Sequence, residues 1–140
     1  MGWFISALLA AFFWGIAPIF GKLGLTKADP LTALTVRTLG VAAALVAINA
    51  FGQKAGALRG LPPKAWIFLL LEGMCGSLLG HYAYLYALKH GAASATVPVT
   101  ASFPIVTMIA AVILLGERLT IGKAIGGALV VLGVLLIRTL

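Results

Sequence analysis

Three ionisable side chains, Arg37, Glu72 and His81, lie inside apolar segments of this sequence. A charge at the centre of a membrane costs at least ~2.5 kcal/mol, so a group retained there usually serves a purpose. A carboxylate such as Glu72 could take up protons or meet a cationic substrate. It could also stay protonated and only fix packing. For His81 we favour this second kind of role, a hydrogen-bonded interior side chain.

The spacing of these groups bears on whether they act together. At about 100° per residue in an α-helix, Glu72 shares a face with Gly76, whereas His81 falls on the opposite face. We therefore expect no proton relay between Glu72 and His81. Arg37 lies one to two turns into its own segment and could extend its guanidinium to the membrane surface. Ligand binding is the alternative for that residue.

The sequence has few residues that could support catalysis or metal binding. The chain has three acidic residues, two histidines and one cysteine, without metal-ligand spacing or a nucleophile-base pattern. We therefore expect neither an enzyme nor a cofactor or metal site. The lone Cys75 excludes an internal disulfide. The net charge of +7 comes without a basic run that could follow a phosphate backbone, so a nucleic-acid partner is not expected.

Five apolar segments must position the ionisable groups. The 140 residues are 62% hydrophobic and 9% charged, whereas about a quarter of the residues of a soluble protein are charged. Windows of about 19 residues predict five transmembrane spans. They cover residues 3–21, 31–52, 65–88, 92–115 and 121–137. The chain is thus predicted to be an all-α, polytopic membrane protein with one five-helix domain, residues 1–140.

Prolines interrupt two of these segments. Pro98 and Pro104 lie in the fourth, and each frees the carbonyl four residues earlier, which for Pro104 is that of Thr100. Pro18 does the same for Trp14 in the first segment. Freed carbonyls in a membrane need partners, so a broken helix usually faces protein or a polar cavity. These segments therefore indicate something polar inside the membrane.

Hydroxyl groups follow one face of the fourth segment, at Thr96, Thr100 and Thr107. They could line a path, or each could bond back to its own helix. Three tyrosines near the end of the third segment could form an aromatic belt at the membrane surface. These are Tyr82, Tyr84 and Tyr86.

Five spans place the two termini on opposite sides of the membrane. The basic residues are nearly balanced between these two sides. The side of the N-terminus carries Lys54, Arg59, Lys64, Arg118 and Lys123. The other side carries Lys22, Lys27, Lys89 and Arg138, with Arg37 a possible fifth. Orientation follows a clear excess of Lys and Arg, which is absent here. The chain could therefore insert both ways and pair as an antiparallel homodimer.

Small residues mark candidate helix contacts. Membrane helices associate where small residues are spaced four apart, as Gly122 and Gly126 are in the fifth segment, with Gly133 seven residues further on. We predict an oligomer contact there, although glycines in so glycine-rich a chain also form such pairs by chance. Gly76 and Gly80 in the third segment have the same spacing.

Short motifs lie in a fixed order along the chain. Residues 13–22 read Phe-Trp-Gly-Ile-Ala-Pro-Ile-Phe-Gly-Lys, and Arg37 lies early in the second segment. Residues 82–89, Tyr-Ala-Tyr-Leu-Tyr-Ala-Leu-Lys, precede the proline-broken segment. Residues 115–120, Leu-Gly-Glu-Arg-Leu-Thr, precede a glycine-rich last segment. In this order the motifs resemble the EamA-type repeat of the drug/metabolite transporter superfamily, over essentially the whole chain.

The resemblance implies an architecture and a site. Typical members have ten helices in two inverted repeats and export amino acids or other small metabolites, and this chain resembles the half-length members, of which two copies would form one unit. A central cavity would be lined by the first, third and fourth helices. The lining residues implied are Trp14, Gly76, Tyr82, Thr100 and Pro104. Glu117 and Arg118 would form a structural or gating pair, and Arg37 is assigned to the same class. Glu72 lies outside the family pattern, so its place in the site rests on its depth alone.

We therefore predict an inner-membrane transporter of small organic metabolites such as amino acids, amines or drug-like solutes. It would work by alternating access as an antiparallel homodimer, with proton coupling through Glu72. The alternatives are a subunit of a heteromeric transporter, a lipid flippase and a non-transporting assembly factor. No residue identifies the substrate, the direction of transport or the coupling ion.

Overall fold

Every element in the described part of the chain is a helix, as predicted. The structure, a computed structural model, describes residues 2–52, 56 and 60–139. The helices are α1 (Gly2–Leu25), α2 (Pro30–Phe51), α4 (Pro63–Glu72), η1 (Gly73–Gly80), α5 (His81–His90), α6 (Ala93–Thr100), α7 (Phe103–Leu115) and α8 (Ile121–Thr139). They form two compact units, unit 1 (Met1–His90) and unit 2 (Gly91–Leu140). Lys54 and Arg59, counted above for the charge balance, lie outside the described residues.

Four stretches of helix are long and apolar enough to cross a membrane. They are Phe4–Leu25, Pro30–Phe51, Pro63–His90 and Ala93–Leu115. The first runs to Leu25 rather than to the predicted Gly21. The fifth predicted span is a shorter apolar helix, Ile121–Ile137. The whole of α8 has 19 residues and is roughly 28 Å long, close to the ~30 Å of a hydrocarbon core.

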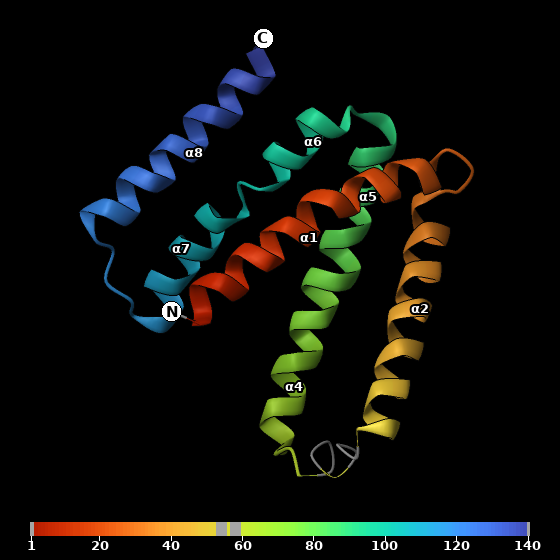
Figure 1. Ribbon diagram of the computed structural model, residues 1–140. Helices are drawn as coiled ribbons and strands as arrows, with labels where there is room; N and C mark the ends of the chain where they lie inside the picture. Colours follow the sequence, from red (N-terminus) through yellow and green to blue (C-terminus); the bar gives the residue numbers. More distant parts are fainter. Residues whose placement is uncertain (1, 53–55, 57–59, 140) are drawn as a thin grey trace. The chain divides into compact units, whose positions relative to one another are not determined.

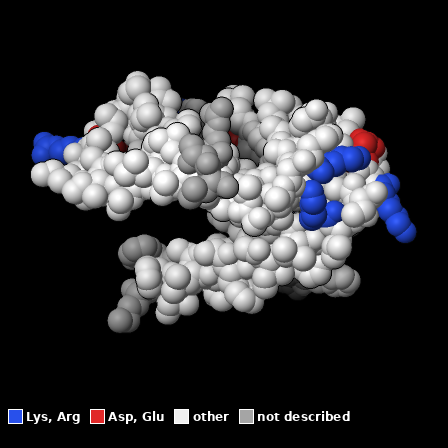
Figure 2. Space-filling model, turned by 90° about the horizontal axis from the view of Figure 1, so that it is seen from above, with Lys and Arg blue, Asp and Glu red and all other residues white. Residues whose placement is uncertain are grey.

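The apolar side chains are mostly exposed. Leu25, Leu34, Leu85 and Leu88 are the buried hydrophobic residues of the described chain, whereas Trp14 is 69% exposed. Figure 2 shows one face on which most of the surface is uncharged and Lys and Arg form a few small groups. A surface of this kind suits hydrocarbon and not water. The chain is a multi-pass membrane protein.

Unit 1 is packed at one end. There α4, η1 and α5 form a continuous rod that lies beside α2, and α1 crosses α5 (Figure 1). A Cβ atom at Gly21 would lie 3.3 Å from Cδ2 of Leu88, so the missing side chain lets α1 approach α5 closely. The four buried leucines lie in α1, α2 and α5, and they form the small core of this unit.

Two lysines join the helix ends beside this core. Nζ of Lys22 donates to the carbonyl oxygen of Leu88 at 2.6 Å and to that of Lys89 at 3.2 Å. Nζ of Lys89 in turn donates to the carbonyl oxygen of Ala28 at 2.8 Å. The last carbonyls of a helix have no partner within it, and a cation there is favoured by the helix dipole. The lysines therefore fix the end of α5 against α1 and the α1–α2 loop.

Asp29 caps α2. Its Oδ1 accepts hydrogen bonds from the backbone N–H of Leu31 at 3.0 Å and of Thr32 at 3.1 Å, and the Thr32 hydroxyl donates to Oδ2. The Thr32 hydroxyl, followed by the backbone donors, lowers the pKa of Asp29 below its ordinary value. The carboxylate form is therefore favoured by folding. Its contribution to stability is present above the unfolded pKa of about 3.9 and is lost as the pH falls through the lower, folded pKa.

We expect Asp29→Asn to remove this pH dependence while keeping the cap, because Asn caps helices as well as Asp does. The test is the thermal unfolding midpoint in detergent, measured from neutral pH down to about pH 3. The difference between the unfolding midpoints of the two proteins should change at the acidic end of this range, where the native chain loses the stabilising carboxylate. If the unfolding midpoints of the two proteins changed in parallel over the whole pH range, the assignment of this pH dependence to Asp29 would be contradicted.

Unit 2 starts with the predicted broken helix. Pro98 lies inside α6 and Pro104 in the first turn of α7, and the two helices are separated at residues 101–102. The hydroxyl of Ser102 donates to the carbonyl oxygen of Val99 at 2.7 Å, which gives one carbonyl at the break a partner. The helical path is therefore interrupted halfway along this span.

The α7–α8 connection is a tight reversal. Gly116 ends α7 with φ 66°, a left-handed conformation that favours glycine, and the N–H of Glu117 donates to the carbonyl oxygen of Ala111 at 3.2 Å. Thr120 caps α8, because its Oγ1 accepts a hydrogen bond from the N–H of Lys123 at 3.3 Å. Helix α8 then returns beside α6 (Figure 1).

Candidate functional site

The third span contains a π-helix at its centre. Residues Gly73–Gly80 form η1, and the N–H of His81 donates to the carbonyl oxygen of Gly76, five residues earlier. Gly76 is the fourteenth residue of the 28-residue span Pro63–His90, so these wide turns lie at its middle. Short π-helical segments occur frequently at functional sites.

Glycine permits this geometry. A Cβ atom at Gly80 would lie 3.2 Å from the carbonyl oxygen of Cys75, closer than side chains usually approach backbone. At Gly73 a Cβ atom would meet nothing within 4 Å. Gly73 and Gly80 therefore differ, and Gly80 is the one of these two that the wide turn requires.

The π-helix changes the relation between Glu72 and His81. Oε1 of Glu72 lies 3.6 Å from the position of a Cβ atom on Gly76, which agrees with the predicted shared face. The carbonyl oxygen of the same glycine accepts the backbone N–H of His81. The expected placement of His81 on the opposite face assumed a regular α-helix, which is not present between the two residues. Both residues therefore contact Gly76, Glu72 through its side chain and His81 through its backbone N–H.

Tyr84 extends this polar group. Arg37 lies on α2, which packs against α5. The rings of His81 and Tyr84 meet edge to face with centroids 5.7 Å apart. Among the described residues, Tyr84 Oη is a buried polar atom without a hydrogen-bond partner. The Tyr84 hydroxyl is thus available to donate a hydrogen bond to an oxygen-bearing ligand.

The sequence did not indicate this grouping. Tyr84 was assigned to an aromatic belt, and His81 to packing. The signal that could have revealed it is the spacing of Gly73, Gly76 and Gly80, which allows wide helical turns. Without that segment, a count by α-helical faces separates the side chains.

The remaining predicted lining residues divide between the units. Trp14, 69% exposed, and Tyr82, 43% exposed, lie in unit 1, whereas Thr100 and Pro104 belong to unit 2. The Thr100 hydroxyl donates to the carbonyl oxygen of Thr96 at 2.9 Å, as one of the two alternatives predicted. The Thr107 hydroxyl bonds back to Phe103 in the same way, at 3.3 Å. These hydroxyl protons are engaged within their own helices.

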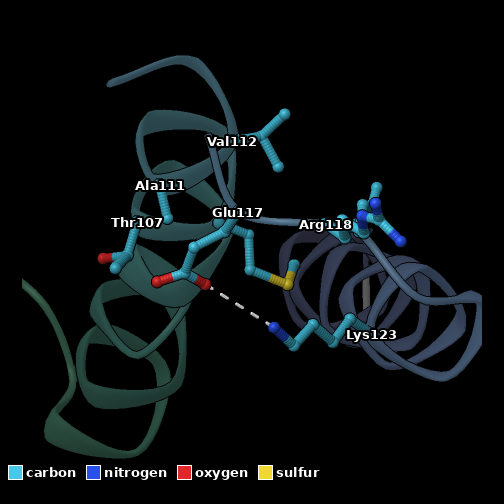
Figure 3. A pocket seen from close by; sticks show the side chains of 8 residues that line it. Thr107, Ala111, Val112, Glu117, Arg118 and Lys123 are labelled. Atoms are coloured by element: carbon cyan, nitrogen blue, oxygen red, sulfur yellow. Dashed lines mark ion pairs between the residues drawn. The ribbon is translucent and has the colours of Figure 1, made fainter. Parts of the chain in front are cut away.

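Glu117 and Arg118, the predicted structural or gating pair, lie at the α7–α8 reversal. The ion-pair partner of Glu117 is Lys123, at 3.6 Å, and not the adjacent Arg118 (Figure 3). These three charged side chains line a pocket of about 240 Å³ at the α7–α8 reversal. The other lining residues are Thr107, Met108, Ala111, Val112 and Leu119.

The predicted contact glycines of α8 remain uncovered. A Cβ atom at Gly122, Gly126 or Gly133 would meet nothing within 4 Å. The glycine that packs within unit 2 is Gly127, where a Cβ atom would lie 2.5 Å from Cε of Met108 on α7. The sequence pattern missed Gly127 because its partner is a single long side chain from another helix.

Comparison with known proteins gives a match over almost the whole chain. Residues 1–139 match the EamA-like transporter family. An uncharacterized transporter in the cobO 3' region of Sinorhizobium sp. is 33% identical over 138 residues, which are 96% of this chain and 95% of that protein. An uncharacterized protein of Methanocaldococcus jannaschii is 29% identical over 133 residues, 95% of this chain and 93% of that protein. No solved structure matches the chain.

Proposed function

The chain belongs to the EamA-like transporter family, and on this premise we propose that it moves small organic metabolites across the inner membrane by alternating access. The proposed solutes are amino acids, amines and drug-like compounds. The four stretches of helix that are long and apolar enough to span a membrane support the location of the chain in a membrane. Support for transport comes from the family and from the name of the Sinorhizobium relative.

The observation that carries the proposal is the polar group at the middle of the third span. Glu72 lies nine residues after Pro63, so it is roughly 14 Å along the span, and Gly76 lies at the span centre. Substrate and coupling-ion sites of transporters lie near the bilayer midplane, where helices are irregular. Glu72, His81 and the π-helix fit this description.

Proton coupling follows from the chemistry of Glu72. A carboxylate can hold either a proton or a cationic group of a solute, but not both at once. Competition between the two for Glu72 would couple solute movement in one direction to proton movement in the other. Gly76 has no side chain to cover the carboxylate, which leaves the approach from the C-terminal side of the span open.

The proposed transport unit is an antiparallel homodimer. The Sinorhizobium relative is matched over 95% of its own length, so it too has the length of one repeat. The nearly equal numbers of basic residues on the two sides permit insertion in both orientations. The uncovered Gly122, Gly126 and Gly133 offer a close-packing surface to a second copy.

The test is solute efflux from liposomes that contain the purified chain and are loaded with a total metabolite extract. Mass spectrometry identifies which solutes leave when a pH gradient is imposed. We expect a limited set of amino acids or amines to leave faster than from protein-free liposomes. Retention of every solute would instead favour the non-transporting assembly factor, and efflux only after addition of a second five-helix chain would favour the heteromer.

A further inference from the structure

The charged pocket of unit 2 lies where an apolar span ends and charged residues begin. The candidate span Ala93–Leu115 contains no charged residue, and Glu117, Arg118 and then Lys123 follow it directly. A span that ends in this way places the next residues at the boundary between hydrocarbon and lipid headgroups. The pocket is therefore at the depth of the lipid phosphates.

The pocket has a charged rim and an apolar floor. Glu117 and Lys123 point toward one another, with 3.6 Å between Oε2 and Nζ, and Arg118 adds a second cation (Figure 3). The floor includes Met108, Ala111 and Val112 on the last turns of α7. One carboxylate against two cations leaves an excess of one positive charge.

We propose that this pocket binds the phosphate of an anionic phospholipid. Arg118 and Lys123 donate to the phosphodiester oxygens, and the upper part of an acyl chain lies along Ala111 and Val112. Charge-assisted bonds from Arg and Lys to phosphate are among the strong hydrogen bonds of proteins. A zwitterionic lipid carries its own cation, which leaves no need for the excess positive charge of the pocket. The apolar floor favours a lipid over free phosphate.

The carboxylate of Glu117 gives this site a property that can be tested by substitution. It holds Lys123 in an ion pair and repels the phosphate, so it weakens lipid binding in the native chain. Removing the carboxylate should strengthen binding, whereas removing the neighbouring Arg118 should weaken it. Opposite effects at adjacent residues are not expected of a merely structural loop.

The experiment is native mass spectrometry of the purified, delipidated full chain titrated with phosphatidylglycerol, phosphatidylcholine or inorganic phosphate. We expect selective retention of phosphatidylglycerol. Arg118→Gln should weaken its binding about fivefold, as estimated for one basic residue near an anionic headgroup. Glu117→Gln should tighten the binding by a similar factor. Lys27→Gln removes one charge from a loop of unit 1 and should leave the binding unchanged.

Several outcomes would overturn the proposal. Equal losses in Arg118→Gln and Lys27→Gln would mean that only the net charge matters. Equal retention of phosphatidylcholine would remove the selectivity, and displacement of the lipid by equimolar inorganic phosphate would assign the pocket to free phosphate. Weaker binding in Glu117→Gln would also contradict it, and this variant decides the question if Arg118→Gln does not fold. None of these readouts depends on transport.

Discussion

Replacing Glu72 with Gln is expected to abolish the dependence of solute flux on a pH gradient. The amide keeps the size and hydrogen-bonding capacity of the side chain but can neither lose a proton nor hold a cation. Flux driven by the gradient should fall to the level of protein-free liposomes, while exchange of solute at equal pH persists in part. The measurement is efflux of a solute identified in the metabolite screen, with and without the gradient.

Asp29→Asn is the matched control for this prediction, since it also removes one carboxylate and lies in a loop. It should transport with the same pH dependence as the native chain. Glu72→Asp, which keeps the carboxylate on a shorter stem, should retain coupling at a reduced rate. Unchanged pH dependence in Glu72→Gln would remove the coupling role from this residue and leave it a packing group.

Replacing Gly80 with Ala is expected to disrupt the middle of the third span. The new Cβ atom would lie 3.2 Å from the backbone carbonyl oxygen of Cys75, which cannot move aside as a side chain would. Overpacking of this kind costs about 1–3 kcal/mol. Relief requires the wide turn to change, and this would displace His81 relative to Gly76. We therefore expect a lower thermal unfolding midpoint in detergent together with slower transport.

Gly73→Ala tests the same segment without the close contact, because a Cβ atom there meets nothing within 4 Å. Alanine favours helix over glycine by about 1 kcal/mol, so this variant should be as stable as the native chain or more so. The helix preference of alanine is common to both variants, so they are expected to differ by the overpacking cost of about 1–3 kcal/mol in unfolding free energy. Equal midpoints would mean that Gly80 has no special place in the π-helix.

The helices could be predicted because lipid imposes a simple rule. Apolar length located the four spans that are long enough, and the cap at Thr120 and the break near Pro104 follow from local chemistry. The C-terminal end of α1 was harder to predict from the sequence. The first predicted span ended at Gly21, whereas α1 continues to Leu25, and Lys22 bonds to carbonyl oxygens of α5 that the sequence does not reveal.

The candidate site was harder to predict, because its geometry depends on a departure from regular helix. The shared face of Glu72 and Gly76 follows from α-helical spacing and agrees with the structure. The hydrogen bond from the His81 N–H to the carbonyl oxygen of Gly76 depends on η1, and the packing of α2, which carries Arg37, against α5 is a tertiary contact. Side-chain partners across helices, such as Lys123 for Glu117, likewise come from the tertiary structure.

The proposed transport unit consists of two copies of this chain inserted in opposite orientations. The most direct test is orientation, measured in two fusions after Leu140, one with a reporter active only on the cytoplasmic side and one with a reporter active only on the opposite side. Signal from both fusions, at comparable expression, is the predicted result. Signal from one fusion alone would contradict the antiparallel homodimer and direct the search to a partner chain.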